Sequence, residues 1–166
     1  MKKLFLIRHA KSSWKEHSKS DHERPLNERG QKDAPEMARL LKKRNIKPGL
    51  ILSSDAVRAK ETAIIFAKVL SYPMEEIIYD SSLYLAGQFD FIKLVNSIND
   101  NIDCCFLVSH NPGISGFAHY LTGSNKTDMP TCAVYGIEFD LETWRSVKER
   151  SGKEILFEYP KMHLKD

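Results

Sequence analysis

The chain has 166 residues, of which 42% are hydrophobic and 28% are charged, a composition typical of a globular protein with one core. Its net charge of +3 is mild, and no basic block is dense enough to indicate nucleic-acid binding. No apolar run approaches the ~20 residues of a membrane span or forms a signal-peptide core. These features predict one cytoplasmic domain over residues 1–166, with no membrane attachment.

The cysteines and histidines are not spaced like a disulfide framework or a metal site. The sequence contains no HExxH and no CxxC motif. Cys104 and Cys105 are adjacent within an apolar run, so a strand would place them on opposite faces of a sheet. We therefore expect no structural metal.

The first apolar run, residues 4–7, predicts a buried strand that ends at Arg8 and His9. Residues 15–27 are polar and predict a surface loop. Residues 28–45 follow Asn27, a good N-cap, with apolar side chains at helical spacing. Pro35 predicts either a kink in this helix or a start near Asp33.

A second apolar run, residues 50–52, predicts another buried strand that ends in small polar residues. Ser54 or Asp55 is expected to cap the next helix, with Arg58 in its first turn. An arginine beside the free N–H groups of a helix start is favoured there if it binds an anion. A solvated surface arginine explains this position alone equally well.

The rest of the chain continues the alternation of strands and helices. Strands are expected at residues 77–79 and 104–108, the latter ending in Ser109 and His110, and helices at residues 90–98 and after Pro112. Residues 133–139 and 154–159 predict strands that extend the sheet in antiparallel fashion. Together these elements predict an α/β fold, a three-layer α/β/α sandwich with a mostly parallel central sheet.

Three of these strands end in residues suited to phosphate chemistry. Parallel strands share one edge at their carboxyl ends, so Arg8, His9, Arg58 and His110 could converge there. Guanidinium groups match phosphate oxygens, and a neutral imidazole can accept a phosphoryl group. Arg8 and His9 alone are better explained by a surface pair, but the whole set predicts phosphoryl transfer.

Three motifs resemble those of the histidine phosphatase superfamily, also called phosphoglycerate mutase-like. Residues 8–10 are similar to its Arg-His-Gly signature, residues 53–63 to its second arginine motif, and residues 109–113 to its second histidine motif. The short length and the patterns of residues 8–14, 24–30, 83 and 84 are most similar to phosphohistidine phosphatases of the SixA type.

This resemblance implies a phosphoglycerate mutase-like fold that works without metal or cofactor. It implies that His9 is the phosphorylated nucleophile and that Arg8, Arg58 and His110 are catalytic residues that bind the phosphoryl group. Two further candidates for phosphate binding come from position alone. Ser12 and Asn111 lie near the predicted pocket, although turn residues of this kind need no ligand to explain them.

The sequence departs from the family pattern at two positions. Ala10 replaces the glycine after the nucleophile, which would be harmful if that position required positive φ. Lys11 stands where the mutase signature has a glutamate, and no motif supplies the carboxylic acid that protonates the leaving group in many relatives. Asp80, just past the third strand, is the nearest candidate general acid by position.

The missing acid favours one class of substrate. An alkoxide leaving group needs a proton, which a positioned acid supplies for a factor of about 10²–10⁴, whereas the imidazole of phosphohistidine leaves as a weak base. We therefore expect a phosphatase that acts on phosphohistidine in a partner protein. A phosphatase of small phosphate esters, a mutase, or a non-catalytic phosphate-binding or phosphoprotein-binding module remain as alternatives. Lys11, Lys15 and Lys19 either guide an anionic partner or keep their loop solvated.

Overall fold

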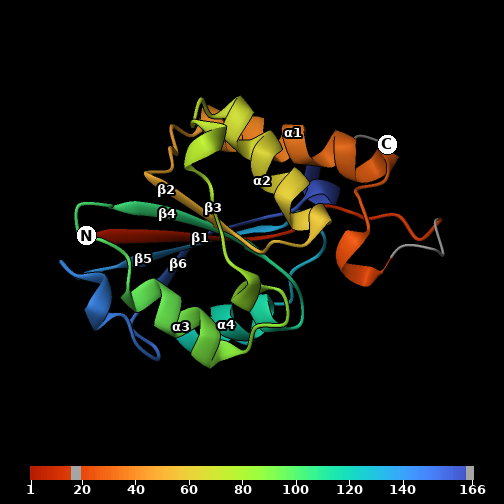
Figure 1. Cartoon of the computed structure of the whole chain (residues 1–166). Coiled ribbons are helices and arrows are strands. Elements are labelled where there is room, and N and C mark those ends of the chain that lie inside the picture. Colours follow the sequence, from red (N-terminus) through yellow and green to blue (C-terminus); the bar gives the residue numbers. More distant parts are fainter. Residues whose placement is uncertain (16–19, 164–166) are drawn as a thin grey trace.

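The computed structural model of the chain describes residues 1–15 and 20–163. Its centre is a six-stranded sheet with the order β3-β2-β4-β1-β5-β6, and helices cover both faces (Figure 1). Strands β1 to β4 are parallel to one another, whereas β5 pairs antiparallel with β1, and β6 antiparallel with β5, at one side of the sheet. The strands are β1 (Lys2–Arg8), β2 (Leu50–Ser53), β3 (Ile78–Tyr79), β4 (Cys104–Ser109), β5 (Val134–Phe139) and β6 (Lys153–Glu158). The predicted three-layer α/β/α fold is confirmed.

Two pairs of helices form the outer layers. Helices α1 (Glu28–Lys43) and α2 (Val57–Val69) pack on one face, and α3 (Gln88–Asn96) and α4 (Gly113–Thr122) pack on the other (Figure 1). Each face has its own apolar core. Cys104 packs against the core under α1 and α2, and Cys105 belongs to the core under α3 and α4, as their alternation along a strand predicts.

Strand β1 lies in the middle of the sheet and is buried on both faces. Leu4 and Leu6 enter one core, while Phe5 and Ile7 enter the other. Its register with β4 places Arg8 opposite Ser109. The residues that follow, His9 and His110, therefore leave the sheet side by side.

The start of α1 agrees with the predicted cap, because the Asn27 side chain accepts a hydrogen bond from the Gly30 amide. The helix then runs through Pro35 without a break, so the alternative start near Asp33 is wrong. The predicted cap of α2 is also wrong. Its N-cap is Ala56, since the Ser54 hydroxyl contacts His110 and the Asp55 carboxylate contacts His22.

Short 3₁₀ helices connect the larger elements. Helices η1 (Asp21–Glu23) and η3 (Ser81–Leu83) contribute residues at the edge where the parallel strands end; the others are η2 (Met74–Glu76), η4 (Trp144–Ser146) and η5 (Pro160–His163). Within residues 1–15 and 20–163, no helix is long and apolar enough to cross a membrane.

Candidate active site

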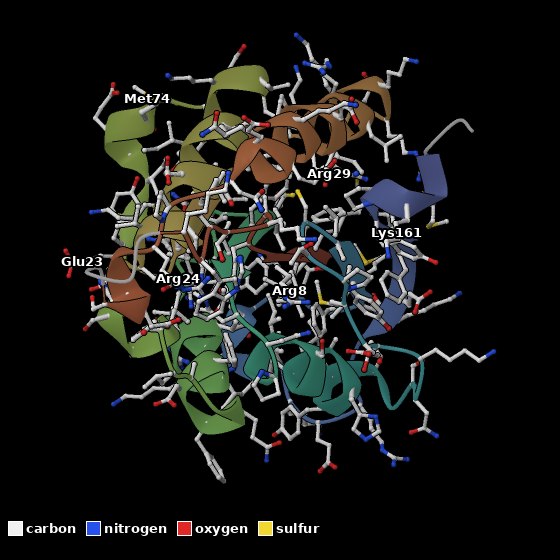
Figure 2. All side chains as sticks on the ribbon, turned by 90° about the vertical axis from the view of Figure 1, so that its right-hand side faces the viewer. Arg8, Glu23, Arg24, Arg29, Met74 and Lys161 are labelled. Carbon is white, nitrogen blue, oxygen red and sulfur yellow. The ribbon has the colours of Figure 1, made fainter. Side chains whose placement is uncertain are left out.

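The carboxyl ends of β1 and β4, and the start of α2 after β2, bring the four predicted residues to one cavity of about 410 Å³. Arg8, His9, Arg58 and His110 all line it. Figure 2 looks onto this edge of the sheet, with Arg8 near the centre and Arg24 beside it. The other lining residues are Lys11, Ser12, Ser13, Trp14, Lys15, Arg24, Asn27, Asn111 and Thr131. The cavity is therefore cationic, with three arginines and two lysines in its walls.

His9 is held as a neutral imidazole with its lone pair on Nε2. Its Nδ1 lies 2.7 Å from the Ala10 carbonyl oxygen, to which it donates a proton, so Nε2 carries the lone pair. Arg58 Nε donates a long hydrogen bond of 3.4 Å to this Nε2. Burial lowers the pKa of His9 to about 4, and the charges of Arg58, Arg8 and Arg24 act in the same direction. A neutral imidazole can attack phosphorus through such a lone pair.

Backbone contacts fix the loop that carries His9. The His9 amide donates to the Ser109 carbonyl, and the Ala10 amide donates to the Thr62 hydroxyl. The Cys132 amide donates to the carbonyls of both Arg8 and His9. Ala10 does not have positive φ, so its methyl group causes no strain where the family signature has glycine.

The first turn of α1 packs directly on the loop after His9. A Cβ atom at Gly30 would lie 2.2 Å from the Lys11 carbonyl oxygen, so only glycine allows this approach. The Asn27 amide donates to the same carbonyl at 3.0 Å, and Ser12 forms a β-bridge with Leu26. These contacts explain the sequence pattern of residues 24–30, because they hold in place the loop that forms the cavity wall.

Arg58 is buried and is oriented by Asp21. Its guanidinium donates to the Asp21 main-chain oxygen at 2.6 Å and to the Asp21 carboxylate at 3.1 Å. The same carboxylate accepts hydrogen bonds from Arg24 and from the Tyr84 hydroxyl. The bond from Tyr84 and the neighbouring Arg58 hold the pKa of Asp21 well below its usual range.

Arg24 is a cavity residue that the sequence reasoning missed. Only 8% of it is exposed, and its guanidinium lies 3.5 Å from the centre of the Trp14 ring. It donates to the Ser12 hydroxyl at 2.6 Å, so Ser12 lines the cavity as a hydrogen-bond partner of Arg24. The only signal for Arg24 in the sequence was its position in residues 24–30, the segment similar to SixA-type proteins. No sequence pattern indicated a role for Asp21.

His110 stands next to His9, with 5.0 Å between the ring centres. Its Nε2 lies 2.8 Å from the Ser54 hydroxyl, and burial lowers the pKa of His110 to about 3. Neither Nδ1 of His110 nor Nε of Arg8 has a hydrogen-bond partner in the described part of the chain. These buried, unpaired nitrogen atoms mark places where a ligand oxygen would be stabilised.

Asn111 lines the cavity, but its side chain also bonds to the protein: the amide donates to the Met129 carbonyl, and the oxygen accepts from Ser115. The Asp80 carboxylate caps η3, where it accepts from the amide and hydroxyl of Ser82. These bonds lower the pKa of Asp80, which is the opposite of what a general acid requires.

Among the described residues, no aspartate or glutamate lines the cavity. No cluster of three histidine, cysteine, aspartate or glutamate side chains in these residues could hold a metal ion. Lys11 and Lys15 are in the wall of the cavity, whereas Lys19 lies outside the described residues.

Comparison with known proteins places this geometry in a family. Residues 4–83 match the sequence model of the histidine phosphatase superfamily, branch 1. An uncharacterized chloroplastic protein of Arabidopsis thaliana is 31% identical over 159 residues, which cover 91% of this chain and 72% of that protein. SixA from Agrobacterium tumefaciens has a solved structure that superposes with a TM-score of 0.83 at 25% identity, over 96% of this chain and 98% of that one. The chain belongs to the histidine phosphatase superfamily.

As a histidine phosphatase, the chain has the phosphoglycerate mutase-like fold and the hydrolase chemistry of its family. Similar structures include a phosphatase named for a small-molecule substrate. Mycobacterial glucosyl-3-phosphoglycerate phosphatase superposes with a TM-score of 0.66 at 16% identity, over 94% of this chain and 98% of that one, which is a likeness of fold alone. The family therefore establishes a phosphatase, and the nature of the leaving group has to be argued from the site.

Proposed function

We propose that this histidine phosphatase removes the phosphoryl group from phosphohistidine in a partner protein, by way of a phosphohistidine intermediate on its own His9. The single observation that carries this proposal is a cavity with three arginines and a neutral imidazole nucleophile but no carboxylic acid in its described lining. Such a cavity binds the phosphoryl group and, in its described lining, lacks a carboxylic acid that would protonate an alkoxide.

In the first step, the lone pair of His9 Nε2 attacks phosphorus in line with the leaving group. The distal ring nitrogen of the substrate imidazole first takes a proton from water; the P–N bond then breaks with its electron pair on the bonded nitrogen, and the ring leaves as neutral imidazole. Arg8, Arg24 and Arg58 stabilise the charge on the phosphoryl oxygens. In the second step, water attacks the phosphorus on His9, and inorganic phosphate and neutral His9 are formed.

The proposal assigns a role to each residue of the site. His9 is the nucleophile, and Arg8, Arg58 and His110 bind the phosphoryl group, with Ser12 and Asn111 at the wall of the same cavity. Asp80 has no step in this mechanism because its carboxylate caps η3. We also propose that residues 1–166 act as one histidine phosphatase domain, since strands beyond the family match at residues 4–83 complete the same sheet.

The test is phosphate release by the wild type and by His9→Ala from three substrates: a phosphohistidine-bearing protein, an aryl phosphate and an alkyl phosphate, each with EDTA present. We expect release from the first two, little from the third, and none from any with His9→Ala. Alkaline quenching during turnover should trap an acid-labile, base-stable phosphoryl group on the wild type. Preference for the alkyl phosphate would contradict the proposed substrate and favour a phosphatase of small esters.

A second candidate rests on the contact between Arg58 and Asp21. Because Asp21 occupies the Arg58 guanidinium, the chain could bind phosphorylated ligands without turning them over. Phosphate binding by calorimetry, with no release from any of the three substrates, would support this binding module instead.

A further inference from the structure

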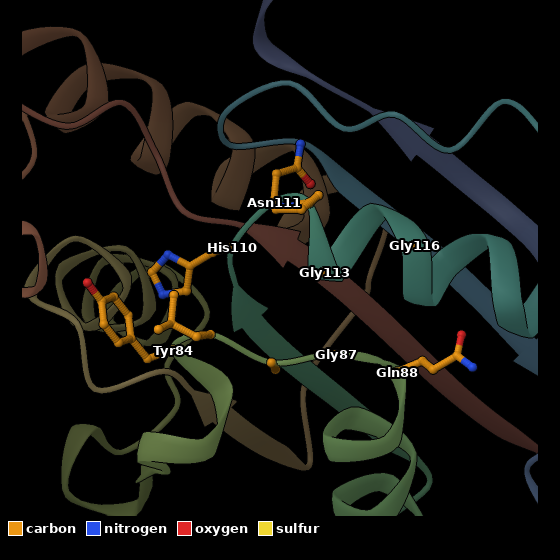
Figure 3. A pocket seen from close by; sticks show the side chains of 10 residues that line it. Tyr84, Gly87, Gln88, His110, Asn111, Gly113 and Gly116 are labelled. Atoms are coloured by element: carbon orange, nitrogen blue, oxygen red, sulfur yellow. The ribbon is translucent and has the colours of Figure 1, made fainter.

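A second pocket of about 350 Å³ adjoins the active-site cavity (Figure 3). It lies between the loop from η3 to α3 and the start of α4. His110 and Asn111 belong to the walls of both pockets, so the two spaces meet at the second histidine. The remaining lining residues are Tyr84, Leu85, Ala86, Gly87, Gln88, Pro112, Gly113 and Gly116.

The walls of this pocket suit an uncharged group. No lysine, arginine, aspartate or glutamate lines it among the described residues, and its polar side chains, Tyr84, Gln88, His110 and Asn111, are uncharged. A carboxylate-bearing leaving group would lose its hydration here without a cation in return. Leu85 in the wall and nearby Phe89 are 85% and 80% exposed, which is typical of a surface that meets another protein.

Gly116 has no structural reason to be glycine. It lies within α4, where glycine costs about 0.5–1 kcal/mol relative to alanine, and no atom lies within 4 Å of the position of its missing Cβ. Gly113 in the same helix differs, since a Cβ there would lie 2.2 Å from the Ala86 carbonyl oxygen. Gly87, in another part of the pocket wall, also has open space at its missing Cβ. Both glycines are exposed in the pocket wall, and each has open space at its missing Cβ that a larger side chain would occupy.

His110 supplies an independent indication of a ligand. It is only 7% exposed, and its Nδ1 has no hydrogen-bond partner within residues 1–15 and 20–163. A buried nitrogen of this kind is costly unless a bound molecule or water satisfies it. His110 stands at the boundary of the two pockets, where the phosphoryl group and its leaving group would meet.

We propose that this pocket, defined by the residues around Tyr84, Gln88 and Gly116, receives the leaving group: the imidazole ring of the partner's phosphohistidine and the peptide next to it. The phosphoryl group lies in the arginine-lined cavity, and the P–N bond that breaks lies beside His110. This inference rests on the proposed function and adds the site that recognises the substrate.

The test compares two P–N substrates that differ in leaving group. Phosphoramidate releases only ammonia and needs no leaving-group pocket, whereas a phosphohistidine-bearing protein does. Gly116→Leu places a large side chain in the pocket, and Gly116→Ala a small one. We expect the ratio of kcat/KM for the phosphoprotein to kcat/KM for phosphoramidate to fall about tenfold or more with leucine and less with alanine.

A matched control and a second variant complete the design. His119→Leu adds a leucine to an exposed position of the same helix, outside the pocket, and should keep the wild-type ratio. Gly87→Leu fills the pocket from a different wall residue and should lower the ratio as Gly116→Leu does, with circular dichroism to verify folding.

The proposed leaving-group pocket is overturned if the ratio is unchanged in the folded leucine variants, whether kcat/KM falls equally for both substrates or for neither. If the wild type cleaves an aryl phosphate but not the phosphoprotein, the proposed function itself fails.

Discussion

The carboxylate of Asp21 lies against the guanidinium of Arg58, and the main-chain oxygen of Asp21 accepts a second bond from the same group. Asp21 also accepts from Arg24 and Tyr84. One carboxylate thus orients two of the three guanidinium groups of the cavity while it partly neutralises their charge. Orientation favours the reaction, and the negative charge opposes phosphate binding.

Asp21→Asn should separate these two effects. The amide keeps the shape and the main-chain acceptor but removes the charge, so inorganic phosphate should inhibit several-fold more tightly, about threefold to tenfold. The two guanidinium groups lose a strong acceptor, so kcat should fall about tenfold. Steady-state kinetics on an aryl phosphate, with phosphate as the competitive inhibitor, measure both. Asp55→Asn is the control, because the Asp55 carboxylate contacts His22. Weaker phosphate inhibition together with lower kcat would mean that Asp21 only supports the loop.

The sequence was sufficient to predict the fold and the convergence of Arg8, His9, Arg58 and His110, because buried strands have recognisable apolar runs and parallel strands end at one edge. It was not sufficient to predict the contacts of Asp21 and Arg24. Both lie in a polar stretch without periodicity, and spacing alone does not reveal which carboxylate pairs with which guanidinium. The cap of α2 was missed for a related reason, since Ser54 and Asp55 bond to histidines instead of the helix.

The two site histidines should remain neutral well below the usual pH of histidine titration. Burial lowers the pKa of His9 to about 4 and that of His110 to about 3. Titration of the imidazole carbons by NMR, with His9→Gln and His110→Asn to assign the signals, measures both values. A midpoint near 6.5 for either ring would contradict the proposed neutral nucleophile and its neutral neighbour.

The same shifts predict how stability depends on pH. Between pH 6.5 and the lowered values, the unfolded chain binds protons that folded His9 and His110 do not, so the free energy of unfolding rises with pH in this window. Acidification from pH 6.5 toward about 3 should therefore remove stability on the order of a few kcal/mol. Urea unfolding across this range should show a shallower loss in His9→Gln than in the wild type. Equal slopes would indicate that other groups control acid unfolding.

Gly30→Ala should damage the loop that holds His9. The new Cβ would lie 2.2 Å from the Lys11 carbonyl oxygen, and both groups belong to backbone that cannot rotate away. We expect a loss of about 1–3 kcal/mol in the free energy of unfolding and lower kcat on an aryl phosphate. Gly116→Ala is the control for stability, since it adds a Cβ in open space within a helix and should stabilise by about 0.5–1 kcal/mol. Equal thermal shifts for the two variants would show that the α1 contact does not constrain the loop.

The rate should depend steeply on the leaving group, because no carboxylic acid is present in the described lining of the cavity. In a series of aryl phosphates, kcat/KM should fall as the pKa of the leaving phenol rises, and alkyl phosphates should be the poorest substrates. Asp80→Asn should change no member of the series by more than about twofold, since asparagine caps a helix as well as aspartate does. His9→Ala gives the background rate for each substrate. High activity on an alkyl phosphate that disappears in Asp80→Asn would identify Asp80 as a general acid, and the preference for P–N bonds would then have no basis in this site.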